Sequence, residues 1–119
     1  MERKENVLDE KSFDFAVKTV RLYKKIVREE KEYVLPKHFL RSGTSIGANV
    51  AEANGAISTA DFSSKVSIAY KESLETKFWL RLFEATEYIE TEEFGEMFGK
   101  ADELSRIMYS ILKKTRMNM

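Results

Sequence analysis

The stretch SFDFAVKTVRLYKKIVREEK, residues 12–31, decides the fold class. Apolar side chains recur along it at spacings of three and four residues, the spacing of one face of an α-helix. The residues on this face are Phe13, Ala16, Val20, Tyr23 and Val27. Because an amphipathic helix buries its apolar face against other elements, the stretch predicts one helix of an all-α domain.

A second apolar line runs beside the first along the same stretch. It consists of Phe15, Leu22 and Ile26. A helix in a lone four-helix bundle needs only one buried stripe. The extra line therefore has two interpretations: one wide core face, or a contact with another subunit through these three residues.

Three further helical segments follow at short intervals. The second begins near Pro36, which is favoured in the first turn of a helix, and closes before Gly55, which suits a helix end. The third begins at the capping box Ser58–Asp61 and extends to about Ile89. The fourth begins at Thr91, followed by acidic residues. Short connections place successive helices antiparallel, so we expect an up-down-up-down four-helix bundle.

Size and composition indicate one domain over residues 1–119, with short flexible ends at about 1–6 and 116–119. The chain contains no cysteine, which suits a reducing compartment. Its charged start is no signal peptide, and no stretch approaches the ~20 apolar residues of a membrane span. We therefore expect a cytoplasmic protein without a membrane partner.

Polar residues line one side of the second predicted helix and one side of the third. Buried carboxylates need partners, and we expect Arg41 and Asn49 to bind Glu72 and Glu75. Such a network would fix the register of the two helices. The alternative is a small-molecule or metal pocket built on Glu52 and the two other glutamates. The two polar lines are Arg41, Ser45, Asn49 and Glu52 on the second helix, and Glu72 and Glu75, between Ile68, Trp79 and Leu82, on the third.

Two sequence patterns resemble catalytic sites but lack the structural surroundings that such sites require. Residues Gly43–Gly47 match the G-x-S-x-G sequence of hydrolase nucleophiles, which requires a strand-to-helix turn and a histidine base. Here the match lies inside a predicted helix, two turns from His38, the only histidine. A carboxylate-bridged metal site would need Glu-x-x-His pairs, and the residue three after Glu72 is Glu75. We predict no catalytic residue, no metal ligand set and no cofactor.

Basic residues form one line along the first helix and a cluster at the C-terminus. Such a line is suited to follow a phosphate backbone, although it is also the ordinary composition of a solvated helix face. Twenty basic residues are balanced by twenty acidic ones, whereas dedicated nucleic-acid binders carry a basic excess. The candidate RNA contacts are Lys18, Arg21, Lys25, Arg28, Lys113, Lys114 and Arg116.

A set of residues in the second and third helices resembles the four-helix-bundle proteins encoded by 23S rRNA intervening sequences. The likeness extends from about residue 6 to residue 111. It implies a bundle assembled into a ring, typically a homopentamer, and no established catalytic activity. It also implies kinship with accessory proteins of diversity-generating retroelements, which bind nucleic acid and a reverse transcriptase. The matching residues are Arg41, Ser42, Ser45, Ile46, Asn49, Glu52, Ala53, Phe62, Ile68, Ala69, Glu72, Glu75, Thr76, Trp79 and Leu80.

The patterns and the resemblance together lead to three functional hypotheses. The first is a non-enzymatic homo-oligomeric interaction protein that associates with ribosomal RNA or with a ribosome-associated RNA–protein complex. The second is a protein-only scaffold ring that binds a partner protein. The third is a bundle that binds a small molecule or a metal ion.

Overall fold

The structure, a computed structural model, describes the backbone of residues 3–117 and the side chains of residues 7–115. It contains α1 (Arg3–Glu30), α2 (Val34–Asn54), α3 (Thr59–Ala85) and α4 (Thr91–Met117), and no strand within residues 3–117. The all-α prediction is confirmed. Of the ends that we expected to be flexible, residues 1–2 and 118–119 lie outside the described residues, whereas 3–6 and 116–117 belong to α1 and α4.

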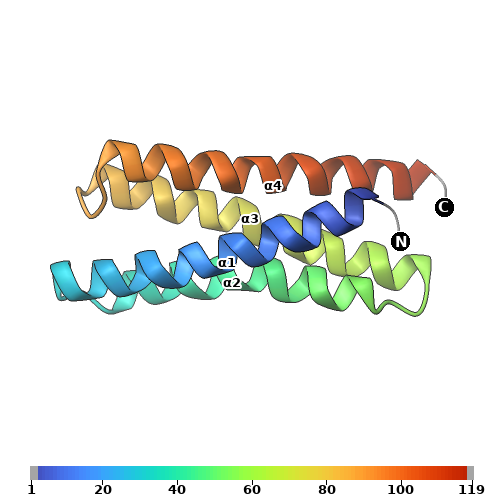
Figure 1. Ribbon diagram of the computed structural model, residues 1–119, viewed down its shortest axis with the longest axis horizontal. Helices are drawn as coiled ribbons and strands as arrows, with labels where there is room; N and C mark the ends of the chain where they lie inside the picture. Colours follow the sequence, from blue (N-terminus) through green and yellow to red (C-terminus); the bar gives the residue numbers. More distant parts are fainter. Residues whose placement is uncertain (1–2, 118–119) are drawn as a thin grey trace.

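The helices follow one another along a bundle of 46 × 21 × 19 Å. Each helix packs against the next, and α1 also contacts α4. In Figure 1 the α1–α2 and α3–α4 turns lie at the left end of the bundle, and the α2–α3 turn lies at the right end. No helix in the described part of the chain is long and apolar enough to cross a membrane.

The ends of the helices have identifiable local causes. The Ser58 hydroxyl accepts a hydrogen bond from the Asp61 backbone N–H at 3.0 Å, which confirms the predicted capping box. The Glu32 carboxylate accepts from the first backbone N–H groups of α2, at 2.6 Å from Val34 N. α3 ends at Ala85 instead of near Ile89, because Glu87 adopts the left-handed conformation (φ 65°) and turns the chain.

The core reverses the roles that we expected for the two apolar lines of the first helix. Phe15 is 1% exposed and Phe13 is 70% exposed. Phe15, Leu22 and Ile26 therefore belong to the core of the protomer and are not oligomer contacts. Both lines have helical spacing, and only the direction in which the other three helices lie determines which of them is buried.

Close approach of α1 and α2 explains two glycines inside α2. A Cβ atom added at Gly43 would lie 2.6 Å from Thr19 Cγ2, and one added at Gly47 would lie 3.1 Å from the Ser12 carbonyl oxygen. Both facing residues of α1 are themselves buried. The glycines therefore allow α1 to pack closely on α2.

Candidate functional site

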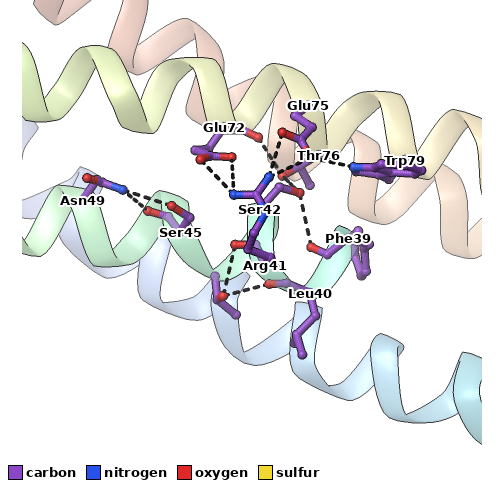
Figure 2. Close-up of polar contacts among 11 residues, drawn as sticks. Phe39, Leu40, Arg41, Ser42, Ser45, Asn49, Glu72, Glu75, Thr76 and Trp79 are labelled. Carbon is purple, nitrogen blue, oxygen red and sulfur yellow. Dashed lines mark hydrogen bonds and ion pairs between the residues drawn. The ribbon is translucent and has the colours of Figure 1, made fainter. Parts of the chain in front are cut away.

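Arg41 joins α2 to α3 through two carboxylates (Figure 2). Its Nη1 donates to both Glu72 oxygens at 3.1 and 3.2 Å, and its Nη2 donates to both Glu75 oxygens at 2.7 and 2.8 Å. The Arg41 side chain is 52% exposed, while that of Glu72 is 19% exposed. The predicted pairing is confirmed, but it lies at the surface edge of the two helices and not in the core.

Two aromatic rings extend this cluster along α3. Trp79 Nε1 donates to Glu75 Oε2 at 2.9 Å, and the ring of His38 stacks on Trp79 with 5.1 Å between centroids. The Trp79 hydrogen bond is the largest cause that lowers the pKa of Glu75; partial burial opposes it, and Arg41 reinforces it. The two carboxylates in turn raise the pKa of Arg41, Glu72 more than Glu75. We call these five residues the Arg41 cluster.

The remaining polar residues of the second helix do not join the Arg41 cluster. Asn49 Nδ2 donates to the carbonyl oxygen and to Oγ of Ser45, at 2.9 and 3.0 Å. The expected bond from Asn49 to a glutamate of α3 is therefore wrong, because the amide is satisfied within its own helix one turn earlier. Glu52 pairs instead with Lys65 of α3 at 3.0 Å.

Buried hydroxyl groups form the polar contacts beneath this surface. Thr76 Oγ1 lies 2.9 Å from Ser42 Oγ between α2 and α3, and Ser73 Oγ lies 2.7 Å from Ser105 Oγ between α3 and α4. All four residues are buried. Of these four residues, Ser73 and Ser105 were not among those predicted from the sequence. Their position on the same helical faces as the core residues was the available signal.

The Arg41 cluster contains no arrangement suited to bond-breaking chemistry. Both carboxylates are occupied by Arg41, and Ser45 lies in the middle of α2 with Asn49 as its partner. His38 stacks on a ring and lies about 10 Å along the helix from Ser45. Among the described residues, no three His, Cys, Asp or Glu side chains are placed to hold a metal ion. What the cluster does is hold α2 and α3 in register while exposing half of a guanidinium group and the stacked rings.

In the structure, several of the basic residues along α1 are occupied by acidic partners. Lys25 pairs with Glu93 of α4, Lys18 lies 3.8 Å from Asp14, and Arg28 lies 4.0 Å from Glu29. The groove between α1 and α4 that contains Lys18, Arg21 and Lys25 is also lined by Glu93 and Glu96. Acidic neighbours therefore neutralise much of this line, and Arg21 has no ion pair among the described side chains.

The C-terminal basic cluster lies far from that line. Lys113 and Lys114 are exposed on α4, about 30 Å along the helix from Glu93, the residue that binds Lys25. The Arg116 side chain lies outside the described residues. The two groups of candidate RNA contacts therefore do not form one surface within the protomer.

Comparison with known proteins assigns the chain to a family. The model of the 23S rRNA-intervening sequence protein family matches residues 4–110. No curated protein matches the chain. A crystal structure at 1.70 Å, of a protein of unknown function from the S23 ribosomal protein family of Bacteroides thetaiotaomicron, superimposes with a TM-score of 0.90. The two sequences are 49% identical, and the match covers 92% of this chain and 98% of that chain. The Arg41 cluster and the two helices that carry it, α2 and α3, thus lie within the matched residues, and the chain belongs to the 23S rRNA-intervening sequence protein family.

Proposed function

We propose that this protein is a non-enzymatic interaction protein: an antiparallel four-helix bundle that assembles with copies of itself into a ring in the cytoplasm. The observation that carries the proposal is the row of large apolar side chains that the protomer leaves uncovered. Phe13, Val34 and Phe78 are 70%, 67% and 52% exposed. Uncovered apolar surface of this kind is typical of a protein–protein contact, and the family resemblance implies a homopentamer.

Part of the uncovered apolar surface lies on α1 and around the start of α2. By helical geometry, Val20 and Val27 share the side of α1 that carries Phe13, and both are only partly buried. At the start of α2, Tyr33 and Val34 are exposed and line a surface hollow of about 700 Å³. A second protein surface that covered this side would remove all of these side chains from water.

A role without catalysis agrees with the chemistry of the Arg41 cluster. Both carboxylates of the Arg41 cluster are held by the Arg41 guanidinium group, and the pKa of Glu75 is lowered and not raised. A carboxylic acid that serves in proton transfer near neutral pH needs the opposite shift. We therefore propose no cofactor and no metal ion.

Association with RNA or with a nucleic-acid-binding protein is the second candidate function. It is favoured by Arg21, which is exposed and free of an ion pair among the described side chains, and by the family description, which refers to 23S rRNA. The net charge of zero weighs against it. The protein-only assembly is therefore the function that the observations favour.

Size-exclusion chromatography with light scattering tests the proposal, on protein purified at low salt with absorbance recorded at two ultraviolet wavelengths. A multiple of 13.8 kDa with a protein-like absorbance ratio supports the protein-only assembly. A heavier species with nucleic-acid absorbance that nuclease removes supports the RNA candidate. A monomer at every concentration overturns the proposal.

A charge reversal separates the two candidates further. Arg21→Glu should reduce RNA affinity and the salt dependence of binding if α1 contacts phosphates. Lys71→Glu, on the exposed side of α3, produces the same change in net charge and is the matched control. Equal RNA binding by both variants would exclude α1 as the RNA surface.

A further inference from the structure

Charge is separated across the end of the bundle that contains the α1–α2 and α3–α4 turns. From Lys18 to Arg41 the chain has eight lysines and arginines and three acidic residues. From Glu72 to Glu96 it has eight acidic residues and two basic ones. At this end of the bundle, the net charge of zero therefore conceals a basic half on α1 and α2 and an acidic half on α3 and α4.

Part of this charge is cancelled inside the protomer. Lys25 pairs with Glu93, and Arg41 pairs with Glu72 and Glu75. Other charges keep no ion pair among the described side chains. Lys31 and Lys37 on the basic half and Glu87 on the acidic half are exposed, and Glu84 is partly exposed.

Each half also carries an open apolar hollow beside its unpaired charges. On the basic half, Tyr33, Val34 and Leu40 line the hollow of about 700 Å³, with Lys37 at the same site. On the acidic half, a hollow of about 540 Å³ is lined by Glu84 and by one basic residue, Arg81. An apolar centre with charges around it is the anatomy of a protein–protein contact. The apolar residues that line the hollow of the acidic half are Phe78, Leu82, Ala85, Phe94 and Phe98.

The two hollows lie at the same level along the bundle. Residues 33–44 follow the α1–α2 turn, and residues 78–98 flank the α3–α4 turn. Both turns lie at the left end in Figure 1. A second copy placed beside the first, with the two long axes parallel, therefore brings the hollow of its acidic half level with the hollow of the first copy's basic half.

We propose that the acidic α3–α4 face of one copy docks on the basic α1–α2 face of a second copy. This inference rests on the proposed self-assembly and adds which surfaces meet. Opposite charges favour this pairing, whereas two basic or two acidic faces would repel each other. Because the two faces differ, the contact is heterologous, and each pair leaves one face of each kind for further copies until a ring closes.

Paired charge reversals in the full chain test the docking. Lys31→Glu with Lys37→Glu places acidic side chains on the basic face, opposite the unpaired glutamates, and Glu84→Lys with Glu87→Lys places basic side chains on the acidic face, opposite the unpaired lysines. Each pair should raise the dissociation constant of the assembly at least about tenfold, because like charges then meet across the contact. The variant with all four changes has opposite charges at these positions again and should assemble like the wild type.

A control removes the effect of net charge alone. Lys113→Glu with Lys114→Glu changes the net charge as much as the basic-face pair, but at the opposite end of α4. Light scattering over a dilution series gives the dissociation constant, and circular dichroism verifies that each variant is folded. Recovery of assembly in the fourfold variant distinguishes loss of a contact from loss of the fold.

The outcomes separate this inference from the proposed function. Dissociation of both face variants, recovery in the fourfold variant and no change in the control support the docking. A wild-type assembly that persists unchanged in both face variants overturns the docking and leaves self-assembly intact. A monomeric wild type overturns both.

Discussion

At Gly43 the absence of a side chain determines how closely α1 approaches α2. Thr19, which faces Gly43, is fully buried, and its hydroxyl donates to the Phe15 carbonyl oxygen at 2.8 Å. An added methyl group would contact both Cγ2 and Oγ1 of Thr19, at 2.6 and 2.7 Å. Neither atom moves away unless the Thr19 side chain rotates and breaks that hydrogen bond or the helix shifts.

Gly43→Ala should therefore lower the free energy of unfolding by about 1–3 kcal/mol, the usual cost of overpacking. Gly99→Ala is the matched control, because Gly99 is exposed in α4 and an added Cβ meets no atom within 4 Å. It should stabilise the protein by about 0.5–1 kcal/mol through helix propensity. Urea denaturation measures both variants, and equal stability of the two alanine variants would contradict the close approach.

Glu75 should make stability depend on pH in the acid range. Its pKa lies below the ordinary value of 4.5, chiefly through the Trp79 hydrogen bond. Because the folded-state pKa is the lower one, the carboxylate contributes stability above pH 4.5, and this contribution disappears as the pH falls through the folded-state pKa. Glu75→Gln should therefore lose less stability than the wild type as the pH falls below 4.5.

Denaturation midpoints at a series of acid pH values test this expectation. Trp79→Phe removes the largest cause of the shift and should flatten the pH dependence in the same direction. Identical slopes in the wild type and both variants would show that Glu75 is not linked to folding.

α3 is the element whose buried face differs most from an ordinary apolar stripe. Ser73 and Thr76 interrupt it and meet hydroxyl groups of α4 and α2. Among the described residues, no buried side-chain nitrogen or oxygen lacks a partner. Paired hydroxyls at helix interfaces therefore favour one register of α3 with both neighbours, because a one-turn shift would break the bonds between helices and leave each hydroxyl only a carbonyl of its own helix.

A double-mutant cycle measures the hydroxyl pair between α3 and α4. Ser73→Ala and Ser105→Ala should each cost about 1 kcal/mol, and the double variant should cost less than the sum because the shared hydrogen bond is lost only once. Ser42→Ala combined with Ser105→Ala is the control, since Ser42 bonds across the α2–α3 contact instead. Additive effects in both cycles would mean that the two hydroxyls do not interact.

Helix identity could be predicted from the sequence, while the direction of burial could not. The spacing of apolar residues predicts all four helices, and local signals such as Ser58 and Asp61 predict where α3 begins. The end of α3 at Ala85 depends on the left-handed turn at Glu87, a conformation that glutamate rarely adopts. The choice between the Phe13 and Phe15 lines depends on where three other helices lie, which no local pattern contains.

The candidate site also has interactions that could be predicted from the sequence and others that could not. Pairing of Arg41 with Glu72 and Glu75 follows from charge and helical spacing. The intrahelical bond of Asn49 does not follow, because an amide has a local partner as acceptable as a distant one. A side-chain interaction can be predicted from the sequence when each group has one suitable partner. When several partners compete, the three-dimensional structure is needed to tell which of them is bound.

For the whole molecule, the two phenylalanines of α1 should have separable effects on folding and on assembly. Phe15→Ala removes a core side chain and should lower the free energy of unfolding by about 3–5 kcal/mol. Phe13→Ser removes an exposed ring and should leave the fold intact. If the α1–α2 face is the contact, that variant should weaken assembly about 10–100-fold.

Thermal melting monitored by circular dichroism and light scattering on dilution measure the two effects separately. Phe15→Ala reports on the protomer and Phe13→Ser on the assembly, so each serves as the control for the other. An assembly that is equally tight in wild type and Phe13→Ser would exclude this part of α1 from the contact.

Trp79 is the only tryptophan in the chain, and it lies at the seam between α2 and α3, bonded to Glu75 and stacked on His38. Its fluorescence therefore comes from a single place in the molecule. Separation of the two helices would expose the indole to water and shift the emission to longer wavelength, whereas loosening of α4 alone would leave the emission nearly unchanged. The protein thus carries a built-in optical probe of one helix contact, which distinguishes local opening from global unfolding without any added label.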